Sequence, residues 1–330
     1  MSVFYYSETY SKGKNAGNKA RNDVEVILSR NYPKLTPYDV KLNNRIVRTL
    51  KVLRTTFSVS KEDIIIVQYP LPRGLNWLAE VLTKIRNIVF VIHDLYELRM
   101  SNFSGVEIRK LRKAYGIISH NEKMTKFLIK NGINKEKIVN LQIFDYLIDN
   151  KTLYDHSNDK DMICFAGNLA KSGFIYNISE KITNIGVNVY GINYDELKNA
   201  KLHYKGSFDS EVVYKKIKGK FGLIWDGDNT ESCTGNFGKY MMYNNPHKIS
   251  MYIAACMPVV IWSDAALADF VLENNIGYVI NKIDDIFEIY ENLTDDKYRI
   301  MSNNVKKIRE DIINGRMLEK ALSLIIKKSN

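Results

Sequence analysis

Short apolar runs alternate with longer amphipathic stretches along the whole chain. Runs rich in Ile and Val, flanked by polar or turn residues, indicate buried parallel strands. In the first half they lie at 3–6, 63–68, 88–92, 116–119 and 138–141, and in the second half at 162–165, 187–190, 221–225, 258–262 and 277–280. Helical patterns lie between them at 16–29, 75–85, 123–130, 246–255 and 265–274. Strands that alternate with helices predict an α/β fold with doubly wound parallel sheets.

The plan occurs twice in 330 residues, which predicts two Rossmann-like domains of ordinary size. A polar stretch at 149–161 interrupts the pattern and is expected to be the linker. We therefore expect an N-terminal domain over 1–155 and a C-terminal domain over 156–311, with parallel sheets facing a central cleft. The charged tail is helical, and the helix at about 312–330 is expected to pack back on the first domain.

Composition limits the possible partners. The net charge is +11, which suits nucleic acid, an anionic membrane face or a phosphorylated substrate, and equally a merely solvated basic surface. The chain has no RNA- or DNA-binding signature, so no nucleic-acid partner is expected. Basic residues recur at helical spacing at Arg45, Arg48, Lys51 and Arg54. No signal peptide and no apolar run of about 20 residues is present, so a cytoplasmic protein is expected.

Three scattered cysteines are too few for a disulfide framework or a zinc site, and buried thiols are the expectation.

Ligands of open α/β sheets bind beyond the carboxyl ends of the strands. In the first domain, the segment 11–23 (SKGKNAGNKARND) opens a helix, and Gly17 permits close approach of backbone N–H groups to an anion; the alternative is a flexible loop. Directly after the run at 88–92, Asp94 is a candidate general base, and His93 is placed to tune or orient it. The alternative for Asp94 is capping of the next helix.

The second domain carries two further strand-end motifs. Gly167 and Asn168 follow its first strand, and Lys171 is placed to reach a phosphate; a plain strand-to-helix turn is the alternative. The motif Trp225-Asp226-Gly227-Asp228 resembles a metal-binding Asp-x-Asp. Metal binding by such a motif is typical of a fold with one domain and a single central sheet, which the duplicated plan of this chain does not support. The preferred interpretation is that Asp226 accepts hydrogen bonds from sugar or ribose hydroxyls.

The segment 244–250 (NNPHKIS) contains a conflict with helix electrostatics. Pro246 suits the first helical position with Asn245 as its cap, which places His247 and Lys248 in the first turn. The positive end of a helix dipole disfavours a cation there unless an anion is bound. We therefore predict that Lys248 clamps a diphosphate.

Several stretches also carry a family resemblance in the same order over nearly the whole chain: NAGNKARND, IHDLYELR, ISHNEKMTKFL, IFDYL, FAGNL, FGLIWDGD, ESCTGNFGKY, NNPHKIS, AALADF and NNIGY. They resemble the bacterial β-1,6-galactofuranosyltransferases of O-antigen and polysaccharide synthesis. More distantly, the chain is similar to the streptococcal adhesin-modifying glucosyltransferases of the two-Rossmann GT-B type.

The resemblance implies a GT-B fold, a UDP-sugar donor and transfer with inversion. We expect the transfer to be metal-independent, with Lys248 and helix N-termini stabilising the departing diphosphate. It implies that Gly167, Asn168 and Lys248 face the diphosphate, that Tyr190 and Gly191 lie near the uracil, and that Asp226 lies near the ribose or donor sugar. Further substrate-binding candidates are Thr234, Gly235, Asn245 and His247. No cofactor is expected beyond the UDP-sugar.

The expected function is transfer of galactofuranose from UDP-galactofuranose to a glucoside on a lipid-linked O-antigen or capsule repeat unit. Such an acceptor would hold the basic protein at the inner membrane face, and a homo-oligomer is possible. Within the enzyme class the alternative donors are UDP-glucose and UDP-galactopyranose. Outside it, the chain would be a non-catalytic nucleotide-sugar-binding partner of another transferase. A nucleotide-sugar epimerase is disfavoured because the dinucleotide fingerprint is missing.

Overall fold

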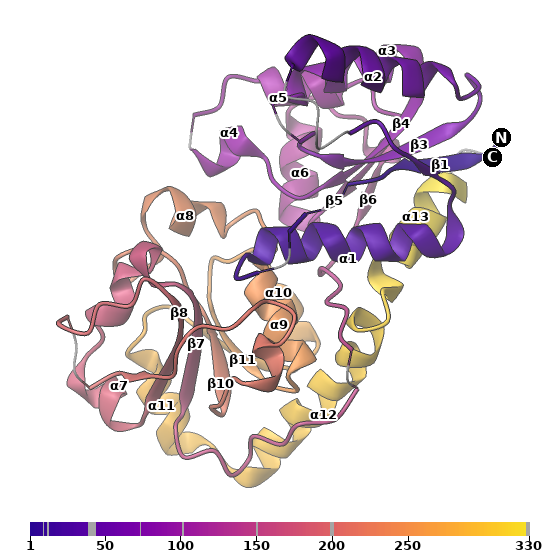
Figure 1. The fold of residues 1–330 in the computed structure, drawn as a ribbon. Helices are drawn as coiled ribbons and strands as arrows, with labels where there is room; N and C mark the ends of the chain where they lie inside the picture. Colours follow the sequence, from indigo (N-terminus) through magenta and orange to yellow (C-terminus); the bar gives the residue numbers. More distant parts are fainter. Residues whose placement is uncertain are drawn as a thin grey trace. The chain divides into compact units, whose positions relative to one another are not determined.

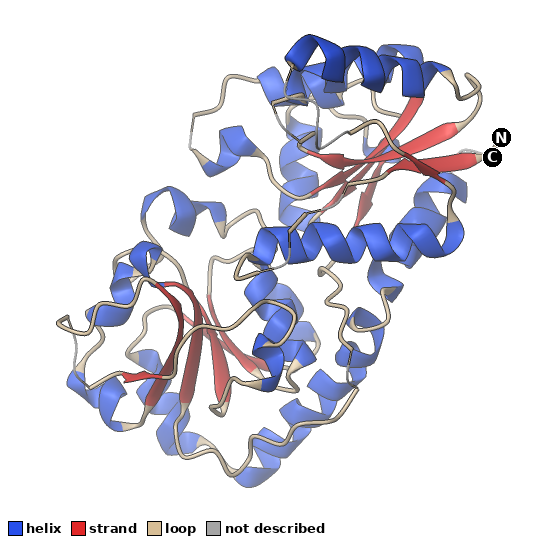
Figure 2. Cartoon of the chain, in the orientation of Figure 1, coloured by secondary structure: helices blue, strands red, loops and turns tan. Residues whose placement is uncertain are grey.

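The computed structural model describes residues 1–8, 10–11, 13–38, 44–72, 74–100, 102–149, 151–198 and 201–327. The chain forms two compact units (Figure 1). Unit 1 contains Met1–Ser11, Ala20–Gln142 and Met317–Asn330, and unit 2 contains Lys12–Lys19 and Ile143–Arg316. Each unit is an α/β layer structure with one parallel six-stranded sheet (Figure 2). Among the described residues, no helix is both long and apolar enough to cross a bilayer.

The sheet of unit 1 has the strand order β2-β1-β3-β4-β5-β6. Its strands are β1 (Val3–Tyr6), β2 (Lys34–Leu35), β3 (Ile64–Tyr69), β4 (Asn87–Ile92), β5 (Gly116–Ser119) and β6 (Ile138–Asn140). Its helices are α1 (Ala16–Asn31), α2 (Arg45–Phe57), α3 (Ala79–Ile85), α4 (Tyr96–Arg99), α5 (Val106–Leu111), α6 (Glu122–Lys130) and α13 (Arg316–Lys327), with 3-10 turns η1 (Asn76–Leu78) and η2 (Lys135–Lys137). The helix α1 belongs to this unit from Ala20 onward, and α13 from Met317 onward. Every residue of β3 is buried, as expected of a central parallel strand covered on both faces.

The sheet of unit 2 has the order β12-β11-β10-β7-β8-β9. Its strands are β7 (Ile163–Asn168), β8 (Val187–Ile192), β9 (His203–Tyr204), β10 (Phe221–Ile224), β11 (Val259–Trp262) and β12 (Gly277–Ile280). Its helices are α7 (Glu180–Asn184), α8 (Gly235–Tyr240), α9 (His247–Ala254), α10 (Ala268–Glu273), α11 (Asp285–Asn292) and α12 (Asp295–Ile312), with 3-10 turns η3 (Leu169–Lys171), η4 (Gly173–Tyr176) and η5 (Val213–Lys215). The three cysteines are buried and free.

Every strand predicted from an apolar run is present within a few residues of its predicted bounds. The strands β2 and β9 were missed because each has only two residues and neither lies in an apolar run. Both are edge strands, so each is hydrogen-bonded to a neighbouring strand on one side only.

The division between the units differs from the predicted boundary at 155, because residues 143–155 belong to unit 2. The backbone N–H of Tyr146 donates to the carbonyl of Ile312, and the Ser250 hydroxyl donates to the carbonyl of Phe144. The polar stretch 149–161 is also packed on unit 2: His156 is buried, and its Nε2 lies 2.9 Å from the Ala255 carbonyl oxygen. Hydrogen bonds between residues so distant in sequence leave no signal in hydropathy.

Candidate functional site

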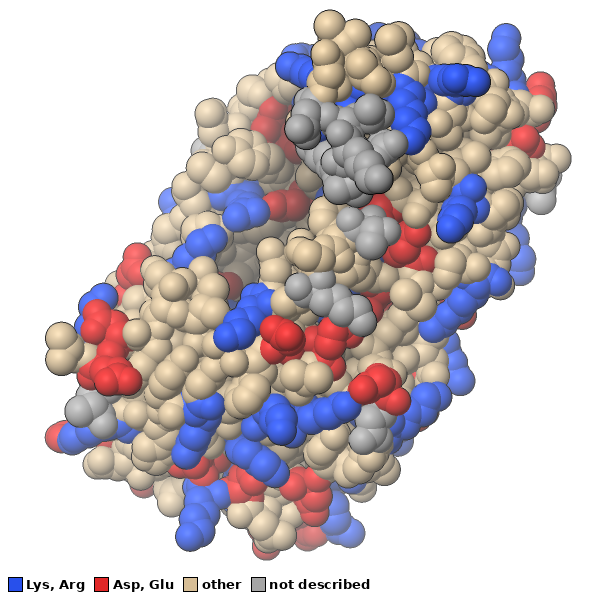
Figure 3. Space-filling model, in the orientation of Figure 1, with Lys and Arg blue, Asp and Glu red and all other residues tan. Residues whose placement is uncertain are grey.

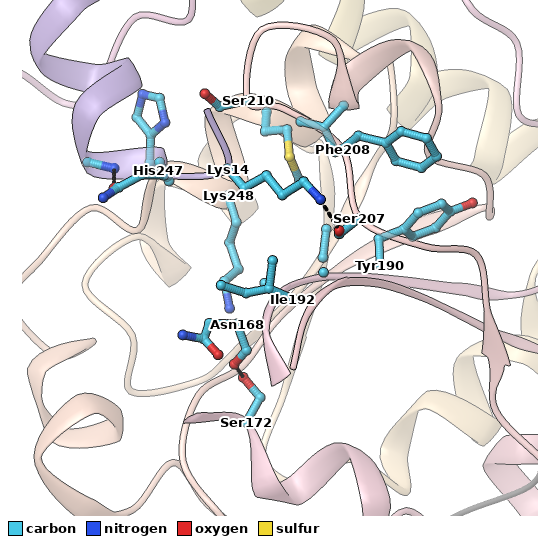
Figure 4. A pocket seen from close by; sticks show the side chains of 18 of the residues that line it. Lys14, Asn168, Ser172, Tyr190, Ile192, Ser207, Phe208, Ser210, His247 and Lys248 are labelled. Carbon is cyan, nitrogen blue, oxygen red and sulfur yellow. Dashed lines mark hydrogen bonds between the residues drawn. The ribbon is translucent and has the colours of Figure 1, made fainter. Parts of the chain in front are cut away.

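A cavity of about 690 Å³ lies within unit 2 at the carboxyl ends of β7, β8 and β10. Its wall includes the residues 14–17 that open α1 and the first turn of α9 (Figure 4). The predicted binding residues that line it are Gly17, Gly167, Asn168, Lys171, Tyr190, Gly191, Asp226, His247 and Lys248. The parallel topology brings them together, because all carboxyl ends of such strands meet at one edge.

The ammonium group of Lys248 is held inside this cavity. Its Nζ donates to the Trp225 carbonyl at 3.2 Å and to Asp226 Oδ1 at 3.3 Å, and lies 4.6 Å from the ring centroid of Phe165. Only 14% of the side chain is exposed. A cation fixed at this depth is available to an anion that enters the cavity.

The start of α9 corrects one detail of the prediction. The cap residue is Pro246, with ψ 126° and no side-chain cap bond, so α9 begins at His247 and Asn245 is not its cap. Because the backbone of Pro246 is extended, the helix begins one residue later than predicted, after the proline and not at it. Lys248 nevertheless lies in the first turn, at the positive end of the dipole.

The floor of the cavity depends on a close approach between β7 and β8. Gly191 has φ +142°, and a Cβ at this position would lie 1.7 Å from the carbonyl oxygen of Gly167. Only glycine fits there. The Gly191 carbonyl accepts a hydrogen bond from the Tyr204 hydroxyl at 2.9 Å. The strand end is therefore a rigid backbone surface without side chains.

Asn168 and Lys171 shape the turn after β7. The Asn168 side chain accepts from the backbone N–H of Ala170 and from the side-chain amide of Asn193, which makes it the cap of η3. The alternative of a strand-to-helix turn is thus realised, and Asn168 still lines the cavity. The Lys171 ammonium group lies 4.8 Å from the ring centroid of Phe237, another wall residue.

The ring of Tyr190 forms one wall, with the ring of Phe208 beside it at 6.4 Å between centroids. The Tyr190 hydroxyl accepts a hydrogen bond from the backbone N–H of Lys218 at 3.0 Å, and burial raises its pKa. Figure 4 shows this hydroxyl pointing away from Lys248. The hydroxyl is anchored in protein and the ring is presented as an aromatic surface suited to a planar base.

The segment before α1 contributes a cation that sequence reasoning missed. Lys14 lines the cavity, and its Nζ donates to the Ser207 hydroxyl at 2.6 Å (Figure 4). The neighbouring Gly13 carbonyl accepts from both the N–H and the hydroxyl of Ser210. The Gly17 N–H, predicted to meet an anion, donates to Asn15 Oδ1 at 2.9 Å. The Asn15 side chain therefore accepts a hydrogen bond from the backbone N–H that was predicted to bind a ligand anion.

His247 is a neutral imidazole in the cavity wall. Its ring packs on Tyr146, with 5.1 Å between centroids, and on Phe144. Burial and the nearby Lys19 lower the pKa of His247 to about 3. A hydrogen bond with the Asp145 backbone acts in the opposite direction and raises this pKa, but its effect is smaller. The Nε2 of His247 is buried and has no hydrogen-bond partner among the residues that the structure describes.

Three predicted binding residues are not part of the cavity wall. Thr234 and Gly235 form the start of α8, and Asn245 is buried directly before Pro246.

The predicted catalytic pair belongs to unit 1, at the carboxyl end of β4. His93 Nε2 lies 2.7 Å from Gln68 Oε1. Asp94 Oδ2 accepts a hydrogen bond from Arg99 at 2.7 Å, while Asp94 Oδ1 is buried without a hydrogen-bond partner in the described part of the chain. The cap of α4 is Leu95, so the alternative of helix capping by Asp94 is not realised.

A second carboxyl group of unit 1 escaped sequence reasoning. Glu8 follows β1, is buried and pairs with Arg21 at 2.7 Å. Burial nevertheless raises the pKa of Glu8 to about 7. Glu8 lies two positions after the apolar run 3–6, but its burial and its pairing with Arg21 are visible only in the folded structure.

The two aspartates of the Asp-x-Asp motif have different surroundings. Asp226 pairs with Lys248, whereas Asp228 packs so closely on Gly173 that a Cβ there would lie 2.4 Å from its Oδ1. Within the described ranges, no group of three or more His, Cys, Asp or Glu side chains is placed to hold a metal ion.

Comparison with known proteins decides the family. Residues 4–143 match the Glucosyltransferase 3-like, N-terminal domain family, and residues 163–325 match the Glucosyltransferase 3-like, C-terminal domain family. The Escherichia coli K12 protein Beta-1,6-galactofuranosyltransferase WbbI is 34% identical over 98% of both chains. The chain belongs to the glucosyltransferase 3-like family. Glucosyltransferase 3 of Streptococcus gordonii is a more distant member, 23% identical over 94% of each chain. The predicted glycosyltransferase class is confirmed.

Solved structures show the fold of this family member. Anabaena HepE, crystallised in complex with UDP, aligns with a TM-score of 0.62 at 12% identity over all of both chains. The lipopolysaccharide outer core galactosyltransferase WaaB aligns with a TM-score of 0.63 at 9% identity over 99% of this chain and 100% of its own. The predicted GT-B class, with two Rossmann-like domains, is confirmed.

Proposed function

We propose that this enzyme transfers galactofuranose from UDP-galactofuranose to a glucoside, forming a β-1,6 linkage with inversion. The observation that carries the donor and linkage is the 34% identity to a β-1,6-galactofuranosyltransferase over 98% of both chains. The match spans 98% of the chain, so it extends over the segments that line the cavity of unit 2.

The cavity supports a nucleoside diphosphate sugar as the donor. In the proposed pose the diphosphate lies against Lys248 and the strand end at Gly167, where a fixed cation and a helix start favour an anion. The uracil lies on the aromatic surface of Tyr190 beside Gly191. Asp226 accepts from hydroxyls of the ribose or the donor sugar. A structure of HepE with UDP shows that this fold accommodates the nucleotide in that protein.

The proposed reaction is a direct displacement without metal. Asp94 accepts the proton of an acceptor hydroxyl, whose oxygen forms a bond to the anomeric carbon as the bond to the UDP oxygen breaks. The electron pair of the broken bond leaves on the diphosphate, where Lys248 stabilises the added charge. The Asp94 side chain is 24% exposed, which leaves part of the carboxylate accessible to an acceptor hydroxyl.

The proposed acceptor is the glucoside terminus of a lipid-linked O-antigen or capsule repeat unit, which would bring the enzyme to the inner membrane face. The net charge of +11 supports association with an anionic surface.

Product analysis tests this proposal. The purified enzyme is incubated with UDP-galactofuranose and a synthetic lipid-linked glucoside, and the product is analysed by NMR. A β-galactofuranosyl residue on the glucose 6-oxygen supports the proposal, whereas an α product or another linkage position contradicts it.

A second candidate donor is UDP-glucose. The observation in its favour is that Streptococcus gordonii Glucosyltransferase 3 matches 94% of this chain. Its lower identity, 23%, places it second.

A further inference from the structure

The helix α2 of unit 1 has an apolar face directed at solvent. Ile46, Leu50 and Phe57 are 69%, 60% and 60% exposed. At 100° per residue they fall within about 40° of one another on the helix circumference. The residues of the helix that pack on the unit, Val52 and Thr56, lie about 120° around the circumference from this stripe. An apolar stripe on the outer face of a surface helix reverses the usual pattern and marks an interaction site.

Cations surround this stripe. The helix sequence RIVRTLKVLRTTF contains no acidic residue. Arg54 and Lys51 flank the stripe on one side of the helix, and the Arg86 guanidinium lies 5.3 Å from the ring centroid of Phe57. The upper part of Figure 3, where Figure 1 places α2, shows Lys and Arg side chains around uncharged ones.

An exposed tryptophan extends the same surface. Trp77 in η1 is 41% exposed, and the guanidinium of Arg45 lies 5.6 Å from its ring centroid. Tryptophan favours the boundary between lipid headgroups and acyl chains. We call the set Arg45, Ile46, Leu50, Lys51, Arg54, Phe57 and Trp77 the α2 surface.

We propose that the α2 surface docks on an anionic lipid bilayer, with its apolar stripe inserted at the headgroup boundary and its cations on the lipid phosphates. Apolar and basic groups on one helix face supply the two signals that stable peripheral binding requires. A second copy of the chain is a poorer occupant, because a two-fold contact through this face would bring its cations against like charges. Placement of the acceptor at a membrane rests on the proposed function, but lipid binding itself requires no turnover.

The test is vesicle co-sedimentation of the full chain with phosphatidylglycerol-containing vesicles and with pure phosphatidylcholine vesicles. The apolar stripe is removed by Ile46→Glu with Leu50→Glu. The matched control is Leu272→Glu with Ile300→Glu, which makes the same changes at exposed helical positions of unit 2. We expect the wild type to bind the anionic vesicles, the stripe variant to bind about tenfold or more weakly, and the control to stay within about twofold.

A charge variant separates the two contributions. Lys51→Gln with Arg54→Gln is expected to weaken binding about tenfold at low salt and to reduce its salt dependence. Binding equal to that on neutral vesicles, or an equal loss in the control, would overturn the proposal. Light scattering that shows a dimer in the wild type and a monomer in the stripe variant would identify a second copy as the occupant, and would overturn it too.

An assay of transfer to a soluble glucoside distinguishes failure of this inference from failure of the proposed function. The stripe variant is expected to retain wild-type transfer to that acceptor. Vesicle binding without any transfer by the wild type would refute the proposed function and leave the lipid surface standing.

Discussion

Replacing Lys248 with Gln removes the fixed cation of the cavity with little change of shape. In the absence of ligand, its Nζ bonds to the Trp225 carbonyl and to Asp226. Gln keeps a donor at shorter reach but brings no charge. We expect UDP to bind more weakly and transfer to slow, because both the bound diphosphate and the departing one lose their positive partner.

The magnitude follows from the burial of the ammonium group. A hydrogen bond to a charged partner contributes about 1.5–3 kcal/mol, and the low exposure of Lys248, at 14%, keeps solvent from replacing it. At 1.4 kcal/mol for each factor of ten, the Kd for UDP should rise about 10- to 100-fold. Loss of the ion pair with Asp226 should lower the free energy of unfolding by only about 1 kcal/mol.

Calorimetric titration with UDP measures the Kd, and initial rates with the donor give kcat/KM. Lys239→Gln serves as the control for net charge, because Lys239 lies on α8 outside the cavity wall. The account expects UDP affinity in this control to stay within about twofold. A Lys248→Gln variant that binds UDP as tightly as the control would refute the diphosphate role of Lys248.

Three further predictions address the cavity and the proposed base. Gly191→Ala should destabilise unit 2 severely, because the added Cβ would overlap the Gly167 carbonyl. The control Gly206→Ala, at φ +90° with open space around it, should lower the free energy of unfolding in urea by only about 1–2 kcal/mol. Equal losses of unfolding free energy in the two variants would contradict the close approach. The pKa of His247 is about 3 in the folded state, against an ordinary value of 6.5 for histidine, so the unfolded state binds the proton first as pH falls. Stability is therefore lost below about pH 6.5, and His247→Asn should reduce the loss of unfolding free energy between about pH 7 and pH 5 by about 1–2 kcal/mol. Tryptophan fluorescence in a Trp77→Phe background reports this unfolding from Trp225 and Trp262 of unit 2; an unchanged pH slope would contradict burial of a neutral ring. Asp94→Asn should lower kcat by about 100-fold or more while the Kd for UDP stays unchanged. Unaltered turnover in this variant would exclude Asp94 as the base. A variant that keeps the protein's function although no turnover is measured would favour the non-catalytic partner.

The fold could be predicted from sequence because a buried parallel strand has a signature that tertiary context rarely overrides. The fully buried β3 begins with four consecutive apolar residues, Ile64 to Val67, and this run marks it in the sequence. Edge strands such as His203–Tyr204 lack that run because both residues are exposed. The boundary between the units depended on hydrogen bonds such as that from Tyr146 to Ile312, which join distant residues without any local pattern.

The cavity was partly predictable for a similar reason. Residues directly after strands, such as Gly167 and Asp226, converge by topology alone. Lys14 was missed because its position in the wall depends on bonds from Ser210 to the Gly13 carbonyl and from Lys14 to Ser207, nearly 200 positions later in the chain. Thr234 and Asn245 lie outside the wall: Thr234 is the cap of α8, and Asn245 is buried directly before Pro246.

The measurement that tests the central claim most directly is a comparison of donors on the purified enzyme. A synthetic lipid-linked glucoside is offered UDP-galactofuranose, UDP-galactopyranose or UDP-glucose, each with and without EDTA. The account predicts a kcat/KM for the furanose donor at least about 100-fold above either pyranose donor, unchanged by EDTA. Transfer from a pyranose donor alone would contradict the galactofuranose assignment, and activity abolished by EDTA would contradict the role given to Lys248 in place of a metal.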